Sequence, residues 1–416
     1  MLRLLTALLL PLSLPAQTVD VLFLGNSYTY SNDLPGTLRQ LALSLGDTVN
    51  TAQSTPGGYT FEGHTTLAAS QQFIDQGGWD FVVLQEQSQI PSFPIAQVQA
   101  DCFPFAAQLV DSIRVHSPCA EPVFFMTWGR QNGDAQNCAN WPPVCTFDGM
   151  NALLRERYLM MAVDNSAWCA PVGAAWKQVR DQQPGINLYS SDGSHPAVAG
   201  TYLAACTFYA TLYRESPVGA SYIAGLDPAT AASLQAIAAS TVLDSLGTWN
   251  IGVNDPDATF TPVATGADVA FMPVVGTGTH AWDLGDGTTS SAVAPVHTYA
   301  QGGTYAVLHV VTDACGRVDS SWATVNVVID SMPEEPPAES SIAYGEVQFA
   351  QGLLWYTSDR SGTLDLFGID GRLVQQVRLG ALQTWSVRPD LPAGTSLVWR
   401  FAGDDGHARK GRLVIP

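Results

Sequence analysis

Basic residues are scarce in this chain of 416 residues: 18 Lys and Arg stand against 37 Asp and Glu, which gives a formal net charge of −19. The basic residues are scattered along the chain and form no long basic segment. Nucleic acid is therefore not an expected partner, because phosphate binding requires basic patches. Charged residues make up 13% of the chain and hydrophobic residues 46%, which is the composition of a globular protein and not of a disordered one.

Long apolar runs are absent beyond the first residues, so we expect no transmembrane segment in the mature protein. The N-terminus itself has the pattern of an export signal. Arg3 supplies a positive start, residues 4–14 form a short apolar run, and Ala16 ends a small-residue cleavage site before Gln17. We therefore expect residues 1–16 to be a signal peptide and the mature protein to be secreted or held at the cell surface, where disulfides can form.

Zinc-ligand spacing is also absent, because the seven cysteines include no Cys-x-x-Cys pair and no Cys/His cluster. Six of them fall within one third of the chain: Cys102, Cys119, Cys138, Cys145, Cys169 and Cys206. Cys138 and Cys145 bracket a Trp-Pro-Pro segment, and Cys119 and Cys169 each lie just before an apolar strand-like run, so both pairs are candidate disulfides, whereas Cys315 stands alone. Spacing leaves the connectivity open, since six cysteines allow fifteen pairings. We expect no metal and no cofactor.

Three kinds of pattern divide the chain after the signal. From residue 18 to 246, short apolar runs alternate with helical patterns, which predicts an α/β domain whose parallel sheet is covered by helices on both faces. The expected strands are 19–24, 81–85 and 123–128. The expected helices are 34–45, 97–116, 150–162 and 196–213, the last with a proline in its first turn.

Near residue 250 the helical patterns stop, and short Val/Thr/Ala runs separated by Gly and Asp turns predict a small β-sandwich over residues 250–330. The motif from Trp282 to Gly287, followed by His297-Thr298-Tyr299 and by 303–307, resembles a PKD domain, an immunoglobulin-like module. We interpret Asp283 and Asp286 as turn formers, with calcium binding as the alternative.

Residues 331–341 form a Pro/Glu/Ser linker, and residues 342–416 a second β-rich module. The runs 362–367, 370–374, 391–394 and 412–415 resemble the C-terminal sorting domain of type IX secretion cargo. That resemblance implies a Gram-negative cell whose outer-membrane secretion machinery is a partner. The alternative is another surface sandwich that binds a partner.

The first candidate catalytic motif, Gly25-Asn26-Ser27, directly follows the first expected strand. Ligand sites of parallel sheets lie beyond the carboxyl ends of the strands. By itself the tripeptide is typical of a turn. Near the end of the same domain, Asp192 and His195 are separated by Gly-Ser, which lets the carboxylate fold back onto imidazole Nδ1 and leaves Nε2 free as a general base for a serine. Taken singly, Asp192 is a turn former and His195 a helix-entry residue.

Gly25-Asn26-Ser27, Gly57-Gly58 and Asp192-x-x-His195 resemble the conserved sequence blocks of the SGNH (GDSL-like) hydrolase superfamily and follow one another in the same order. The resemblance covers residues 18–246 and implies a flavodoxin-like three-layer α/β/α domain. It also implies that Ser27 is the nucleophile, His195 the base and then the acid, and Asp192 the residue that orients His195. The backbone amides of Ser27 and Gly58 would then donate to the oxyanion.

One block departs from the superfamily. Where many members have Gly-x-Asn-Asp, with the asparagine in the oxyanion hole, this chain has Leu84-Gln85-Glu86-Gln87-Ser88-Gln89. A glutamine amide can donate the same hydrogen bond, so we predict Gln85 as the third donor, with Gln87 and Gln89 as alternatives. Glu86 is expected to be a solvated loop acid.

Three other residues have a functional and a structural interpretation. His64 either lines the pocket or is a solvated or helix-capping histidine. Trp128 is either an apolar or sugar-stacking wall or a core residue, and Arg130 is a candidate to meet an acidic substrate.

The sequence predicts a secreted serine esterase that removes acetyl or other short acyl groups from carbohydrate by way of an acyl-enzyme. The choice of carbohydrate rests on association with the accessory modules, since one fold hosts many substrates. The alternatives are a non-catalytic surface protein that binds glycans with a vestigial triad, and a lipase or phospholipase, for which no apolar lid is evident.

Overall fold

The computed structural model describes residues 18–329, 347–350, 353–358, 360–369, 371–381, 383–387 and 394–415. The expected signal peptide and linker lie outside the described residues. The chain divides into two compact units, Met1–Asp330 and Ser331–Pro416. Within the described residues, no helix is both long and apolar enough to cross a bilayer.

The first unit opens with a five-stranded parallel sheet in the order β2-β1-β3-β4-β5. Its strands are β1 (Thr18–Leu24), β2 (Thr48–Ser54), β3 (Phe81–Leu84), β4 (Glu121–Phe125) and β5 (Trp168–Ala170). In this order the chain changes winding direction between β1 and β3, so a crevice is expected at their carboxyl ends. The predicted flavodoxin-like α/β fold class is confirmed.

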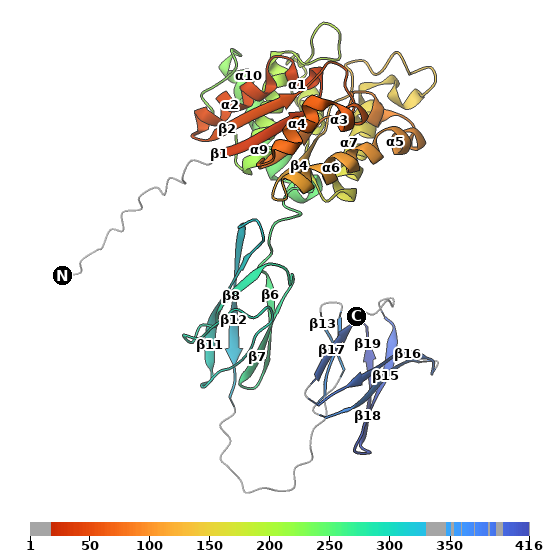
Figure 1. Cartoon of the computed structure of the whole chain (residues 1–416), viewed down its shortest axis with the longest axis vertical. Helices are drawn as coiled ribbons and strands as arrows, with labels where there is room; N and C mark the ends of the chain where they lie inside the picture. The colour runs from red at the N-terminus through yellow and green to blue at the C-terminus, as the bar shows by residue number, and fades with distance from the viewer. Residues whose placement is uncertain are drawn as a thin grey trace, which may run out of the picture. The chain divides into compact units, whose positions relative to one another are not determined.

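Helices cover both faces of this sheet (Figure 1). They are α1 (Ser27–Tyr30), α2 (Leu34–Leu45), α3 (Phe61–Thr66), α4 (Ala68–Gln76), α5 (Ile95–Asp101), α6 (Phe103–His116), α7 (Phe147–Asp164), α8 (Val172–Gln182), α9 (Val198–Tyr213) and α10 (Pro228–Leu243), with the 3₁₀ turns η1 (Ile90–Ser92), η2 (Pro142–Cys145) and η3 (Leu246–Trp249). Helix α9 packs against α2, α8 and α10, and every one of its residues after Val198 is buried. A helix that is apolar on all sides requires such cover on all sides.

Two of the predicted helices, 97–116 and 196–213, differ from the observed ones. The helix predicted over 97–116 is two helices, α5 and α6, because Pro104 lies in the first turn of α6 and has no N–H with which to continue α5. Pro196 lies before α9, where Ala197 is the N-cap. The carbonyl oxygen of Pro196 accepts hydrogen bonds from the side chains of Asn32 and Ser190, which places the proline in the turn and not in the helix.

The second part of this unit is an antiparallel sandwich of two sheets, in the orders β10-β7-β6 and β12-β11-β8-β9. Its strands are β6 (Phe260–Thr265), β7 (Asp268–Pro273), β8 (Thr279–Asp283), β9 (Thr289–Ser290), β10 (Val296–Thr298), β11 (Gly303–Thr312) and β12 (Val318–Val327). Trp282, Tyr299 and Val307 are central to its core. Asp283 and Asp286 accept hydrogen bonds from Gly285 N–H and from Thr288 N–H, which is the turn role expected of them.

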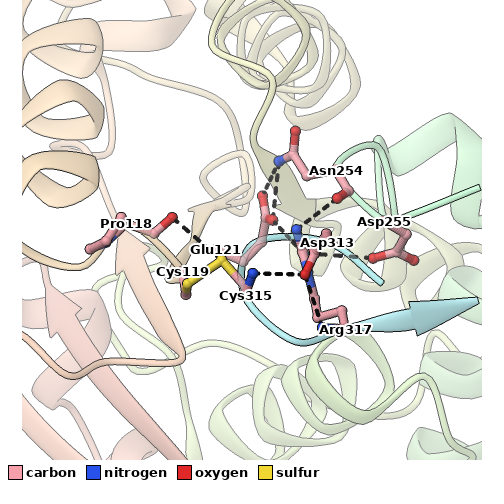
Figure 2. Close-up of a disulfide and its surroundings, with 8 residues drawn as sticks. All are labelled: Pro118, Cys119, Glu121, Asn254, Asp255, Asp313, Cys315 and Arg317. Carbon is pink, nitrogen blue, oxygen red and sulfur yellow. Dashed lines mark hydrogen bonds and ion pairs between the residues drawn. A yellow bond between two sulfur atoms is a disulfide. The ribbon is translucent and has the colours of Figure 1, made fainter. Parts of the chain in front are cut away.

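A disulfide joins this sandwich to the α/β domain, between Cys119 and Cys315 (Figure 2). Cys119 precedes β4, and Cys315 lies in the turn between β11 and β12. The predicted Cys119–Cys169 pair is therefore wrong, because Cys169 is a fully buried residue of β5 with a free thiol. The predicted Cys138–Cys145 disulfide is confirmed.

The second unit is also antiparallel, with sheets in the orders β13-β14-β17 and β16-β15-β18-β19. Its strands are β13 (Gln348–Ala350), β14 (Leu353–Ser358), β15 (Gly362–Gly368), β16 (Leu373–Leu379), β17 (Gln383–Val387), β18 (Ser396–Gly403) and β19 (Ala408–Val414). Tyr356, Leu364, Trp399 and Phe401 lie in its core. The predicted β-rich character of this module is confirmed, and its role in sorting stays a prediction.

Candidate active site

The structure brings Ser27, His195 and Asp192 into one chain of hydrogen bonds. Ser27 is the first residue of α1, directly beyond the carboxyl end of β1, and its Oγ lies 2.8 Å from Nε2 of His195. On the other side of the imidazole, Nδ1 lies 2.5 Å from Oδ2 of Asp192. This is the arrangement in which a carboxylate holds the proton on Nδ1 and leaves Nε2 able to take the serine proton.

The turn between Asp192 and His195 is fixed by the carboxylate itself. Its Oδ1 accepts hydrogen bonds from the backbone N–H groups of Ser194 and His195, at 2.9 and 3.0 Å. Gly193 has a φ of 66°, which a side chain would disfavour. Burial raises the pKa of Asp192, but the hydrogen bonds from the His195 ring and from the two amides outweigh it, so that the pKa lies below its usual value. Asp192 is therefore a carboxylate at neutral pH.

Two aromatic side chains hold the turn in place. The ring of Tyr28 stacks on Trp128 with centroids 4.7 Å apart, and Trp128 stacks on Trp176 at 3.8 Å. Tyr28 Oη lies 2.6 Å from Ser194 Oγ, and Trp128 Nε1 donates to the carbonyl oxygen of Ser194. Both contacts fix the residue next to His195, whose own ring meets the edge of Tyr28. Trp128 is fully buried, so it is a core residue and not a pocket wall.

The Gly57-Gly58 loop is tied to the residue before the nucleophile. Asn26 Nδ2 donates to the carbonyl oxygen of Tyr59 at 2.9 Å. Gly58 has a φ of 69°. Among the described residues, neither the amide of Ser27 nor that of Gly58 donates to an acceptor of the chain, which leaves both free for an oxyanion. Their role as donors stays a prediction.

Gln85 has a different task from the predicted one. Its Nε2 donates to Asn26 Oδ1 at 2.8 Å and to the carbonyl oxygen of Glu86 at 2.6 Å, which uses both hydrogens of the amide. Its Oε1 accepts from the backbone N–H of Asn26 and from the hydroxyl of Thr29. Since Gln85 is fully buried and fully bonded, the prediction that its side chain donates to the oxyanion is wrong. It fixes the turn that carries Ser27.

The two alternative glutamines, Gln87 and Gln89, differ in how far their side-chain N–H groups are already hydrogen-bonded. Gln89 Nε2 is engaged by Asp134 and Gln136. Gln87 Nε2 donates only to Gln89 Oε1 among the described residues, and Gln87 is half-buried. Of the three glutamines, Gln87 is thus the one with an N–H to offer.

His64 and Glu86 are buried supports rather than surface groups. His64 Nε2 donates to the carbonyl oxygen of Gly25 at 2.9 Å, and Nδ1 accepts from Ser70 Oγ at 2.7 Å. Burial lowers the pKa of His64 to about 4, against the opposing hydrogen bond to Gly25, so the ring is neutral at pH 7. Neither of its two expected roles holds, because the side chain is fully buried. It braces the first residue of the nucleophile turn.

Glu86 is not the solvated loop acid expected from the sequence, since it is fully buried. Both carboxyl oxygens accept from the backbone N–H of Phe61, and Oε1 also accepts from that of Gln87. Burial raises the pKa of Glu86 to about 8, with the amides of Gln87 and Phe61 acting in the opposite direction. Glu86 thus joins β3 to the start of α3, just after the Gly57-Gly58 loop.

Arg130 does not present a free charge to a substrate. Its Nη1 lies 3.0 Å from Oδ1 of the buried Asp134. The described residues contain no cluster of three or more His, Cys, Asp or Glu side chains that could hold a metal ion. The contributions of Tyr28 and Ser194 were missed from the sequence. Their adjacency to Ser27 and His195 was the one available signal.

Comparisons with known proteins match parts of the chain. A family model described as PKD domain matches residues 251–329, in agreement with the prediction for this segment. Collagenase ColQ1 from Bacillus cereus (strain Q1) is 45% identical over 56 residues, which are 14% of this chain and only 6% of the collagenase.

Two solved structures are similar to the α/β part. A DUF4886 family protein from Bacteroides uniformis is 20% identical, with 54% of this chain and 95% of that chain covered and a TM-score of 0.48. A candidate SGNH hydrolase from Slackia heliotrinireducens is 28% identical, with 46% of this chain and 97% of that chain covered and a TM-score of 0.38. Each of these two similarities covers about half of this chain.

Proposed function

We propose that this protein is a secreted serine esterase that removes acetyl or other short acyl groups from carbohydrate. The observation that carries the proposal is the continuous hydrogen-bond chain from Ser27 Oγ through His195 to Asp192. Either turn alone would be ordinary. Their meeting across 168 residues of sequence is the geometry that acyl transfer needs.

In the proposed reaction Ser27 Oγ attacks the ester carbonyl carbon while His195 Nε2 takes its proton. Asp192 stabilises the imidazolium that forms. The oxyanion of the tetrahedral intermediate faces the amides of Ser27 and Gly58. His195 then protonates the departing alcohol oxygen, and the acyl group stays on Ser27. Water deprotonated by Nε2 attacks the acyl-enzyme, which releases the carboxylic acid and restores Ser27.

The accessibility of the triad supports a soluble or polymeric ester as the substrate. The side chains of His195 and Asp192 are 40% and 48% exposed, so this acid-base pair lies at the surface and not in an enclosed apolar cavity. A long acyl chain needs apolar cover that such an open site does not supply. Short acyl groups on a bulky alcohol fit it better.

The proposed location is the outside of a Gram-negative cell. Two disulfides and a PKD domain fit an extracellular protein. The signal-like N-terminus and the likeness of residues 342–416 to a type IX sorting domain support export across both membranes, with the secretion machinery as a partner.

The test is hydrolysis of p-nitrophenyl acetate, butyrate and octanoate by the full chain, with Ser27→Ala as control. We expect the acetate ester to be preferred and the variant to retain only background activity. Acetate release from acetylated xylan then tests the substrate class. A preference for octanoate would contradict deacetylation, and equal rates for both proteins on all esters and on the xylan would contradict the enzyme itself.

A further inference from the structure

A second feature of the α/β domain is a pocket of about 320 Å³ beside the triad turn. It is lined by Gln131, Arg180, Tyr189 and the segment 184–188. This volume is at the lower end of the usual range for small-molecule sites, about 300 to 1,000 Å³. In a chain with twice as many acidic as basic residues, its lining contains one arginine and no acid.

Arg180 carries a charge that the described part of the chain does not neutralise. It forms no salt bridge there, in contrast to Arg130 with Asp134 and Lys177 with Asp148. Instead the guanidinium lies 4.0 Å from the ring centroid of Phe147 and 5.5 Å from that of Tyr189. Contacts of this kind hold a guanidinium in place and leave its N–H groups available to an anion.

Two side-chain amides add neutral donors to the same pocket. Asn187 Oδ1 accepts from the backbone N–H of Tyr189 at 3.1 Å, which orients its Nδ2 hydrogens away from that contact. Gln131 is exposed at the pocket lining. One guanidinium and two amides without a competing carboxylate match the needs of a carboxylate or sulfate group.

The pocket is joined to the triad turn at both ends. Gln131 N–H donates to the carbonyl oxygen of Gly193, the residue after Asp192, at 2.8 Å. Tyr189 pairs with Pro196 in an isolated β-bridge, and its hydroxyl donates to Gly129. Residues of the pocket thus contact the turn that carries Asp192 and His195 on both sides, which places the pocket next to this turn.

We infer that the pocket of Arg180, Asn187 and Gln131 is a subsite for an anionic group, a carboxylate or a sulfate, on the carbohydrate whose ester is cleaved at Ser27. This inference rests on the proposed function. It makes uronic acid or sulfated glycans the preferred substrates within the carbohydrate class. Arg180 is the specificity-determining residue.

The test is inhibition of p-nitrophenyl acetate hydrolysis by D-glucuronate, D-glucose 6-sulfate and D-glucose, using the full chain. We expect one or both anions to compete at concentrations about tenfold lower than glucose, since a hydrogen bond to a charged group contributes about that factor. Competition by glucuronate alone identifies a carboxylate subsite, and competition by the sulfate alone a sulfate subsite. Added salt should weaken the competition.

Arg180→Gln and Lys177→Gln form a matched pair, because both remove one positive charge from α8 and only Arg180 lines the pocket. Arg180→Gln should raise the inhibition constant of the anion about tenfold, and Lys177→Gln should leave it unchanged. Equal effects of the two variants, or equal inhibition by glucose and the anions, would overturn the subsite.

A failure of the proposed function is distinguishable from a failure of the subsite. If the wild type hydrolyses no ester, calorimetric titration with D-glucuronate and D-glucose 6-sulfate compares the wild type with the same two variants. Binding lost only in Arg180→Gln would support an anion site in a non-catalytic protein. Absence of binding by the wild type would overturn the subsite as well.

Discussion

Asn26 and Gln85 hold each other by two hydrogen bonds: the backbone N–H of Asn26 donates to Gln85 Oε1 at 3.0 Å, and Gln85 Nε2 donates to Asn26 Oδ1 at 2.8 Å. Both residues are buried, and the two bonds join the carboxyl ends of β1 and β3 at the residue before Ser27. The strand order places these two ends side by side. The turn that carries Ser27 therefore lies between β1 and β3, where the winding direction of the sheet changes.

Replacing Gln85 with Met should therefore impair folding and catalysis together. The change keeps the side-chain length but leaves the amide of Asn26 without its acceptor, at a cost of about 2–4 kcal/mol of unfolding free energy for the buried groups that lose partners. Urea unfolding and kcat on p-nitrophenyl acetate are measured on the same samples. A large fall in kcat with unchanged stability would instead restore Gln85 as an oxyanion donor.

Asp192→Asn tests the orientation of His195. The amide can no longer hold the proton on Nδ1 as the carboxylate does, so kcat should fall on the order of a hundredfold or more. The fold should tolerate the change, because the carbonyl oxygen of the new amide still accepts from the amides of Ser194 and His195. Unaltered kcat at pH 7 would contradict the assigned role of Asp192.

Glu121 gives the protein a pH-dependent stability at the junction with the β-sandwich (Figure 2). Asn254 Nδ2 donates to both of its oxygens, and Arg317 Nη1 lies 3.9 Å away. Burial raises the pKa of Glu121 to about 7, against the opposing effects of Asn254 and Arg317. Its stabilising contribution is therefore complete below pH 4.5, the value of a free glutamate, and is lost as the pH rises through 7.

Glu121→Gln should remove this pH dependence. As the pH rises from 4.5 to 8, the unfolding free energy of the variant should increase relative to that of the wild type by on the order of 1–3 kcal/mol. The comparison is made by urea unfolding at both pH values, so that titrations common to the two proteins cancel. A difference that does not change with pH would contradict the raised pKa.

Removing the Cys119–Cys315 disulfide by a double substitution to Ser should lower the unfolding free energy by about 2–5 kcal/mol, because the bridge closes a long loop of the unfolded chain. Its residues are 196 apart in sequence, whereas those of Cys138–Cys145 are 7 apart. The matched double substitution of Cys138 and Cys145 should cost less. The reverse order would contradict the loop-closure account.

The parts of the fold that the sequence predicts are those with strong local patterns. β1 and α2 begin and end within one residue of the predicted ranges, since an apolar run and a 3.6-residue period define them. β2 was missed because it is an edge strand with only two buried residues. β5 was missed because it has three residues, too few for a period to be read.

The site was predictable where the residues that contact one another are also close in sequence. Asp192 and His195 are three residues apart, and the turn between them fixes their contact. The roles of Gln85, His64 and Glu86 depend on burial and on partners from other strands and loops, which no local pattern records. The pairing of Cys119 with Cys315 depends in the same way on contacts between two separate folds.

The most direct test of the central claim is covalent labelling of the full chain with a fluorophosphonate, followed by mass spectrometry of the peptides. A serine activated by His195 should be phosphonylated at Ser27 with one label per chain. Ser31→Ala, which removes a hydroxyl four residues away, should label like the wild type, and Ser27→Ala should not label. Absence of label from Ser27, or a label on another serine that persists in Ser27→Ala, would contradict the account.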